Sequence, residues 1–141
     1  MRIDNTILNR LYKQLNDYIQ LNNKYKTKVS TYQLEKISNN LIVIEEIDNS
    51  MLVKQFGGNE TISAIGYQIN IYCPIDVKIE NKTITKLQQA MELRGLVDDI
   101  LGCKNKMNRI YAKPTPNLDN SVYRITMTYT AQYNDYRQTI V

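Results

Sequence analysis

The residue types that most often carry acid–base, metal or phosphate chemistry are sparse in this sequence. It contains no histidine, and histidine is both the usual general base near neutral pH and the commonest metal ligand among side chains. No GxxxxGK[ST] phosphate loop, GxGxxG turn or GxSxG serine occurs, and Gly57-Gly58 alone is too short to enclose a phosphate. The sequence therefore predicts a protein that is not an enzyme and has no catalytic, metal-binding or cofactor-binding residues.

Two pairs of adjacent carboxylates, Glu45-Glu46 and Asp98-Asp99, are the remaining candidates for a shared proton or metal ion. Neighbouring residues on a strand point to opposite faces, and neighbours on a helix diverge by about 100°. Neither pair can therefore hold one ion by spacing alone, and both are predicted to be solvated surface residues.

Two cysteines complete the list of chemically reactive side chains. Cys73 and Cys103 are thirty residues apart, with no CxxC spacing and no histidine. A structural disulfide is not expected in a reducing cytosol. Both cysteines are predicted to be small residues of the core or of its boundary.

The formal net charge of +4 is unevenly distributed. Residues 1–40 and residues 102–141 each carry +4, whereas residues 41–101 carry −4. Oppositely charged patches suit contact between protein surfaces. A basic run around Tyr111 is also compatible with a nucleic-acid patch, although its first two lysines complement the negative end of a preceding helix, which is the favoured interpretation. The run consists of Lys104, Lys106, Arg109 and Lys113.

A chain of 141 residues with 43% hydrophobic content is expected to form a single domain, residues 1–141, with a core of its own. No apolar run approaches the roughly 18–20 residues that span a bilayer. The amino terminus alternates polar and apolar residues and lacks the continuous apolar stretch of a signal peptide. A cytosolic protein without a membrane partner is expected.

Two amphipathic helices are predicted. Apolar residues recur at helical spacing after Asp4, which is placed to cap a helix over residues 4–21. Thr85, with Gln88 three residues later, forms a capping-box pattern. The helix that it opens is predicted to run to residue 101, with Gly102 as its C-cap.

Strands are predicted where β-branched or alternating apolar residues occur. Residues 41–47 form one strand, residues 50–56 its hairpin partner, and Gly57-Gly58-Asn59 a turn. Residues 65–73 and 123–133 alternate apolar and polar side chains, while residues 22–40 and 114–120 are predicted to be connections. This order predicts an α+β fold, a mainly antiparallel sheet of four to five strands with two helices packed on one face.

The second helix has an unusually wide apolar arc. Its apolar residues are Leu87, Ala90, Met91, Leu93, Leu96, Val97, Ile100 and Leu101. They spread over roughly 220°, whereas a helix lying on a sheet needs about 100° or a little more. Arg94 and Asp98, one turn apart, fall inside this arc, where they can pair with each other or reach a neighbouring chain.

The wide arc predicts a subunit interface at Met91, Arg94, Leu96 and Asp98. The alternative is that residues 22–40 or the C-terminal tail cover this side of the helix. Both interpretations stay open at this point.

Several stretches resemble the tail terminator proteins, also called tail-completion or neck proteins, of long-tailed bacteriophages. They are the amphipathic amino-terminal helix, Tyr67-Gln-Ile-Asn-Ile-Tyr-Cys73 before the second helix, Ala90-Met-Glu-Leu-Arg-Gly-Leu-Val-Asp-Asp-Ile-Leu101 within it, and Pro116-Asn-Leu-Asp followed by Tyr123-Arg-Ile-Thr-Met-Thr-Tyr-Thr-Ala131. The likeness covers nearly the whole chain. Residues 22–40 are longer and more polar than the corresponding segment of the family.

The resemblance implies a structural virion protein, a homo-oligomer that forms a hexameric ring, caps the tail tube and joins the tail to the neck. Its implied partners are the tail tube protein and a neck or connector protein, and its implied site of assembly is the cytoplasm of the bacterial host. Members of the family are not enzymes and bind no cofactor, and specific nucleic-acid binding is not expected. The alternative, from another class, is a small nucleic-acid-binding regulatory domain that uses the basic run and the basic amino-terminal third.

Overall fold

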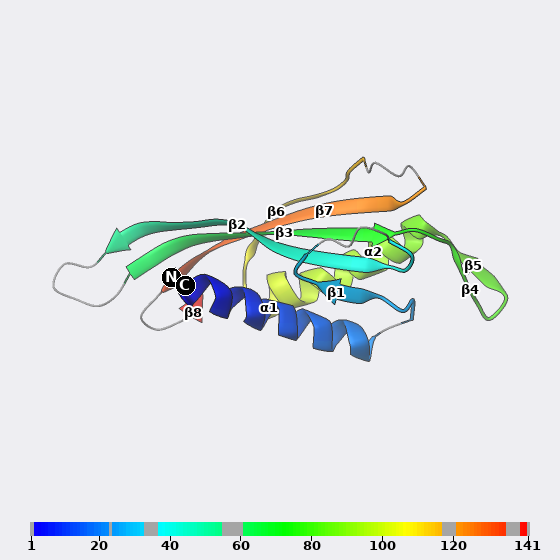
Figure 1. Ribbon diagram of the computed structural model, residues 1–141, viewed down its shortest axis with the longest axis horizontal. Helices are drawn as coiled ribbons and strands as arrows, with labels where there is room; N and C mark the ends of the chain where they lie inside the picture. Colours follow the sequence, from blue (N-terminus) through cyan, green and yellow to red (C-terminus); the bar gives the residue numbers. More distant parts are fainter. Residues whose placement is uncertain are drawn as a thin grey trace.

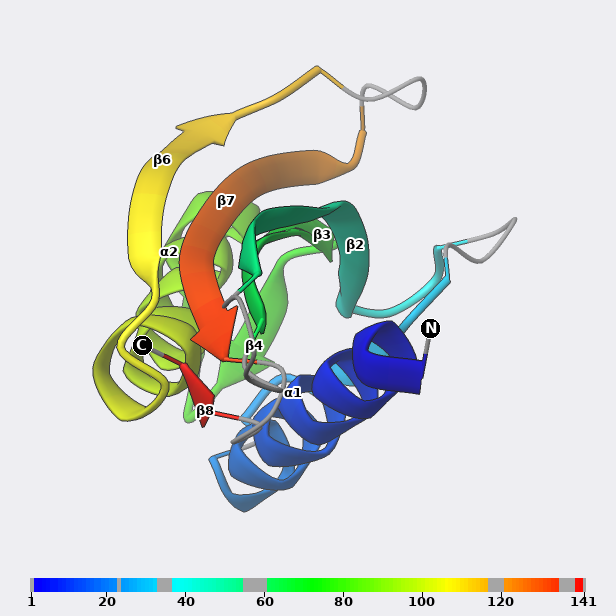
Figure 2. The same ribbon diagram turned by 90° about the vertical axis from the view of Figure 1, so that its left-hand side faces the viewer.

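A curved sheet of six strands carries two helices on one of its faces, as Figure 1 and Figure 2 show for the computed structural model. The structure describes residues 2–22, 24–32, 37–54, 61–116, 121–134 and 139–140. In chain order the elements are α1 (Arg2–Leu21), β1 (Lys28–Ser30), β2 (Leu41–Lys54), β3 (Thr61–Cys73), β4 (Val77–Ile79), β5 (Lys82–Ile84), α2 (Lys86–Asp98), the π-helical turn η1 (Asp99–Lys104), β6 (Asn108–Pro114), β7 (Tyr123–Asn134) and β8 (Thr139–Ile140).

The strand order β1-β2-β3-β7-β6, with β8 paired to β7, confirms the predicted α+β class. All pairs in this sheet are antiparallel except β1 with β2, which is parallel. The sheet has one strand more than expected, and β4 and β5 form a separate two-stranded sheet. Strand β1 lies inside residues 22–40, which were predicted to be a connection. The strand was not predicted because its three residues are too few to show a strand pattern in the sequence.

The predicted hairpin between residues 41–47 and 50–56 is wrong. Residues 41–54 form one long strand, β2, whose partner is β3. The polar stretch at Asp48 and Ser50 looks like a turn in the sequence, but register shifts between Glu46 and Asp48, and again between Met51 and Val53, keep it within the strand. The predicted turn at Gly57-Gly58-Asn59 lies outside the described residues, as do residues 117–120 of the predicted loop.

The predicted alternation in β3 and β7 is confirmed and defines the core. The buried side chains beneath the helices are Ile65, Tyr67, Ile69, Ile71 and Cys73 of β3, Ile125, Met127, Tyr129 and Tyr133 of β7, Ile7, Leu11, Leu15 and Ile19 of α1, and Ala90, Leu93 and Val97 of α2. Burial of one such large apolar side chain contributes about 1.5–3 kcal/mol. Both helices are therefore held on the same face of the sheet.

The capping box at the start of α2 is confirmed. The backbone amide of Gln88 donates to Thr85 Oγ1 at 3.2 Å, and the backbone amide of Thr85 donates to Gln88 Oε1 at 3.0 Å. The first helix begins at Arg2, so Asp4 lies in its first turn and not before it.

The predicted C-cap at Gly102 is wrong, because α2 continues into η1 and the helical path ends at Asn105. The side-chain amide of Asn105 donates to the Ile100 carbonyl at 2.7 Å and to Gln14 Oε1 of α1 at 2.8 Å. Gly102 has a different role, because it leaves room for the Asp98 carboxylate. A Cβ atom at this position would lie 2.8 Å from Asp98 Oδ1, closer than real Cβ contacts.

Candidate interaction surface on the second helix

The inner half of α2 and its continuation in η1 is covered by the protein's own core. Ala90, Leu93, Val97, Ile100 and Leu101 are buried, and Leu96 is half-buried against the same core. The sheet and α1 therefore account for most of the wide apolar arc. What remains uncovered is one outer flank, where Leu87 and Met91 are each 49% exposed.

The four predicted interface residues do not lie together. Met91, Arg94 and Asp98 share one flank of the helix, because residues three, four and seven positions apart lie within about 60° of one another. On this flank Asp98 contacts β7 and β6. Leu96 follows Arg94 by two residues and therefore lies about 200° further round the helix. It lines a cavity of about 340 Å³ beside the end of α1, together with Asn22, Lys24, Glu92, Gly95 and Asp99.

Asp98 is tied to the sheet. Its Oδ1 accepts from the Tyr129 hydroxyl at 2.6 Å and lies 3.8 Å from Arg109 Nη1 of β6. Of the two alternatives for Arg94 and Asp98, the internal pair is not formed. Within the described ranges Asp98 forms its ion pair with Arg109. Burial raises the pKa of Tyr129, and the hydrogen bond to Asp98 raises it further. The hydroxyl therefore stays protonated and remains the donor.

Two more tyrosines bind carboxylates on the opposite flank of α2 and η1. Tyr18 of α1 donates to Asp99 Oδ2 at 2.8 Å, and Tyr25 donates to Glu92 Oε2. Burial and the bond to Glu92 raise the pKa of Tyr25 to about 12. The helix is thus held from both flanks by tyrosine hydroxyls.

These bonds partly correct the interpretation of Asp98-Asp99 as merely solvated residues. The two carboxylates do point in different directions, as their helical spacing predicts, but each accepts a hydrogen bond from a tyrosine. Sequence reasoning missed Tyr18, Tyr25 and Tyr129 as partners because they are 81, 67 and 31 positions from their carboxylates. The only available signal was the abundance of tyrosine, whose polar tip and apolar body suit the margin of a core.

Gly95 occupies the outermost line of α2. No atom lies within 4 Å of the position where its Cβ would be, so the protein's own packing does not require a glycine there. A glycine inside a helix costs about 1 kcal/mol relative to alanine. What the missing side chain provides is a place where another surface can approach the helix backbone closely.

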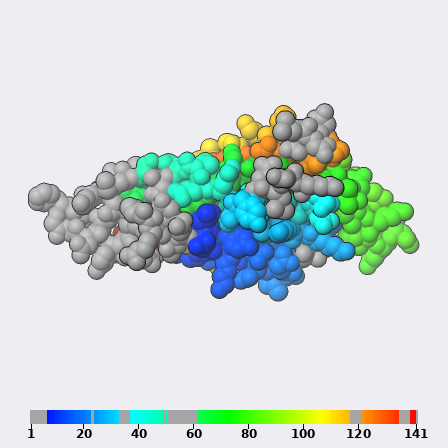
Figure 3. Space-filling view, in the orientation of Figure 1, coloured from blue at the N-terminus to red at the C-terminus, as the bar shows by residue number. Residues whose placement is uncertain are grey.

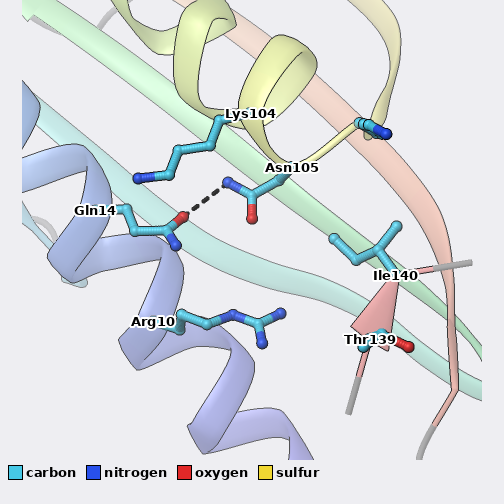
Figure 4. Close-up of a pocket in the computed structure, with 7 residues that line it drawn as sticks. Arg10, Gln14, Lys104, Asn105, Thr139 and Ile140 are labelled. Carbon is cyan, nitrogen blue, oxygen red and sulfur yellow. Dashed lines mark hydrogen bonds between the residues drawn. The ribbon is translucent and has the colours of Figure 1, made fainter. Parts of the chain in front are cut away.

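A second hollow on the surface is basic. It measures about 340 Å³ and lies between α1, the end of η1 and β8. Figure 4 shows Arg10 and Gln14 reaching it from the first helix, and Lys104 extending toward the hydrogen-bonded pair of Gln14 and Asn105. Lys106 also lines it, and no carboxylate is among its described lining residues.

The rest of the predicted basic run lies on β6, where Arg109 pairs with Asp98 and Lys113 Nζ lies 4.8 Å from the centre of the Tyr111 ring. Of the two cysteines, Cys73 is buried, as predicted for a core residue, and burial raises its pKa to about 12. Cys103 is exposed on η1, so its prediction as a residue of the core or of its boundary is wrong. Both thiols are free.

No three histidine, cysteine, aspartate or glutamate side chains of the described part of the chain are grouped so as to hold a metal ion. None of its helices is long and apolar enough to cross a bilayer. A search against protein-family models and a search of curated proteins each find no match.

Proposed function

We propose that this protein is a structural, non-enzymatic subunit that associates with copies of itself into a ring. The observation that carries the proposal is the outer flank of α2, where Leu87 and Met91 are each 49% exposed beside Arg94. Exposed apolar side chains that are grouped on one element mark sites of protein contact more often than scattered ones do. Methionine and arginine are also enriched in protein interfaces.

The rigidity of α2 supports the same conclusion. Tyr129 holds one flank of the helix, and Tyr18 and Tyr25 hold the other. A surface that is already ordered loses little conformational entropy when a partner binds. The outward position of Gly95, which no intramolecular contact requires, adds a place for close approach.

The assembly in which this ring would act follows from the resemblance to phage tail terminator proteins. The stretches that carry it lie on α1, β3, α2 and β7, the elements that build the core. We infer a ring in the tail or neck of a virion, assembled in the host cytoplasm, which caps the tail tube and contacts a neck or connector protein. Six copies are the number that the resemblance implies.

Oligomer mass is the direct test. Native mass spectrometry and sedimentation velocity, over a series of concentrations and with purified tail tubes added, are expected to show rings for the wild type. Met91→Glu places a charge on the exposed flank and is expected to abolish them. Leu21→Glu is the matched control, because Leu21 is 84% exposed at the end of α1. A wild type that remains monomeric at every concentration and does not bind tube ends contradicts the proposal.

A second candidate, nucleic-acid binding, is favoured by the basic hollow around Arg10, Lys104 and Lys106. Binding through phosphates would release counterions, so the affinity for DNA would fall steeply as salt rises. The double variant Lys104→Ala/Lys106→Ala would reduce both the affinity and the slope of its salt dependence. Met91→Glu, which is expected to abolish the ring, would leave the affinity for DNA unchanged, because Met91 is exposed on α2 and does not line the basic hollow. The two candidates therefore respond to different variants.

A further inference from the structure

The first margin of the sheet is acidic where β2 forms it. Strand β1 pairs with β2 only across residues 41–43, so residues 44–54 have no strand on their outer side within the described part of the chain. Glu45 and Asp48 are exposed on this stretch, and Ile47 between them is 49% exposed. Figure 3 shows β2, in turquoise, at the surface above the blue helix α1.

The opposite margin, formed by β6, is basic. Strand β6 ends the strand order, with β7 on one side and no described strand on the other. Arg109 and Lys113 are exposed on it, Lys106 is exposed just before it, and Ile110 is 59% exposed. Figure 2 shows β2 and β6 on opposite sides of the curved sheet.

Each margin places its exposed isoleucine at an irregularity of the strand. The register skips Ile47 between Glu46 and Asp48, and it skips Ile110 between Arg109 and Tyr111. Such bulges interrupt the row of main-chain donors and acceptors along an edge and oppose simple strand addition. Contact at these margins would therefore be made by side chains, with an isoleucine between charges of one sign on each.

We propose that the acidic β2 margin of one copy docks against the basic β6 margin of the next copy. This inference rests on the proposed function, since it names the partner surface within the ring. The charges are complementary and the two surfaces are different, so the contact is head-to-tail, the kind that closes into rings when the rotation allows it. The exposed flank of α2 adjoins the β6 margin through the Asp98–Arg109 pair, and the two form one surface.

Reversing the charge of each margin separately provides the test. One variant, Glu45→Lys/Asp48→Lys, has two basic margins, and the other, Lys106→Glu/Lys113→Glu, has two acidic margins. The second variant leaves the Arg109–Asp98 pair intact. Each variant alone is expected to be monomeric, whereas a one-to-one mixture is expected to assemble, because every acidic margin then meets a basic one.

Matched controls carry the same changes of charge elsewhere on the surface. Asp17→Lys/Glu80→Lys and Lys78→Glu/Lys82→Glu alter exposed residues of α1 and of the β4–β5 hairpin, and both are expected to assemble like the wild type. Circular dichroism establishes that each variant is folded before its mass is measured by native mass spectrometry.

Three outcomes overturn the inference while leaving the proposed ring intact. They are assembly of either margin variant alone, failure of the mixture of folded variants to assemble, and loss of assembly in the two controls. Failure of the wild type to form rings, by contrast, contradicts the proposed function. Recovery of rings only in the mixture supports both.

Discussion

The hydrogen bond between Tyr129 and Asp98 is expected to be the main link between α2 and the sheet on the outer flank. Tyr129 is buried, and its hydroxyl donates to a carboxylate oxygen at 2.6 Å. Hydrogen bonds to charged groups contribute about 1.5–3 kcal/mol to stability. The Asp98 side chain is 37% exposed, so water can partly replace it as a partner, and the lower end of this range applies.

The single changes follow from these values. Tyr129→Phe is expected to lower the free energy of unfolding by about 1–2 kcal/mol. Asp98→Ala leaves the buried hydroxyl without its acceptor, which costs about 1–3 kcal/mol, and removes the ion pair with Arg109. That pair spans 3.8 Å between half-exposed side chains and contributes less than about 1 kcal/mol. Asp98→Asn keeps an acceptor and is expected to cost only about 1 kcal/mol.

A double-mutant cycle isolates the bond from these other effects. Urea unfolding of the wild type, Tyr129→Phe, Asp98→Ala and the double variant is expected to give a coupling free energy of about 1–2 kcal/mol. Arg109→Ala serves as the control, because it removes the ion pair and keeps the hydrogen bond. A coupling within about 0.5 kcal/mol of zero, which is the scatter between independent sites, would refute the claim that this bond anchors the helix.

Three further outcomes are expected. Gly95→Ala should raise the free energy of unfolding by about 0.5–1 kcal/mol, because its Cβ meets no atom within 4 Å. Gly102→Ala should lower this free energy by about 1–3 kcal/mol, because its Cβ would press on the Asp98 carboxylate that holds α2. Equal effects of the two variants in thermal unfolding would contradict this reasoning. In the native protein a thiol reagent should modify Cys103 rapidly and Cys73 only after unfolding, since Cys73 is buried with a pKa of about 12. Equal rates of modification of the two thiols would contradict this expectation. The pKa of Tyr25 is about 12 in the folded chain, above the ordinary value of about 10, so its contribution to stability is complete below pH 10 and is lost as the pH rises toward 12. The free energy of unfolding in urea should therefore fall less steeply over this range in Tyr25→Phe than in the wild type. An unchanged slope would show that Tyr25 does not take part.

Much of the fold followed from local patterns. The alternation in β3 and β7 depends only on the geometry of a strand, whose successive side chains face opposite sides. The amphipathic period of α1 and the capping box of α2 likewise involve residues no more than a few positions apart. These features appear in the structure where the sequence predicts them, with a shift of two residues at the start of α1 and of three at the end of α2.

The spacing of apolar residues also indicated that α2 has more apolar surface than a sheet can cover, but not what covers it. Only the tertiary structure placed Leu96 on the side of α1 and left Met91 exposed on the other flank. The tyrosine–carboxylate bonds were hidden for the same reason, since their partners are at least 31 positions apart. Whether residues 41–54 form one strand or two depended on the length of β3 beside them. Local periodicity can be derived from the geometry of one element, whereas long-range contacts are selected by the packing of the whole chain.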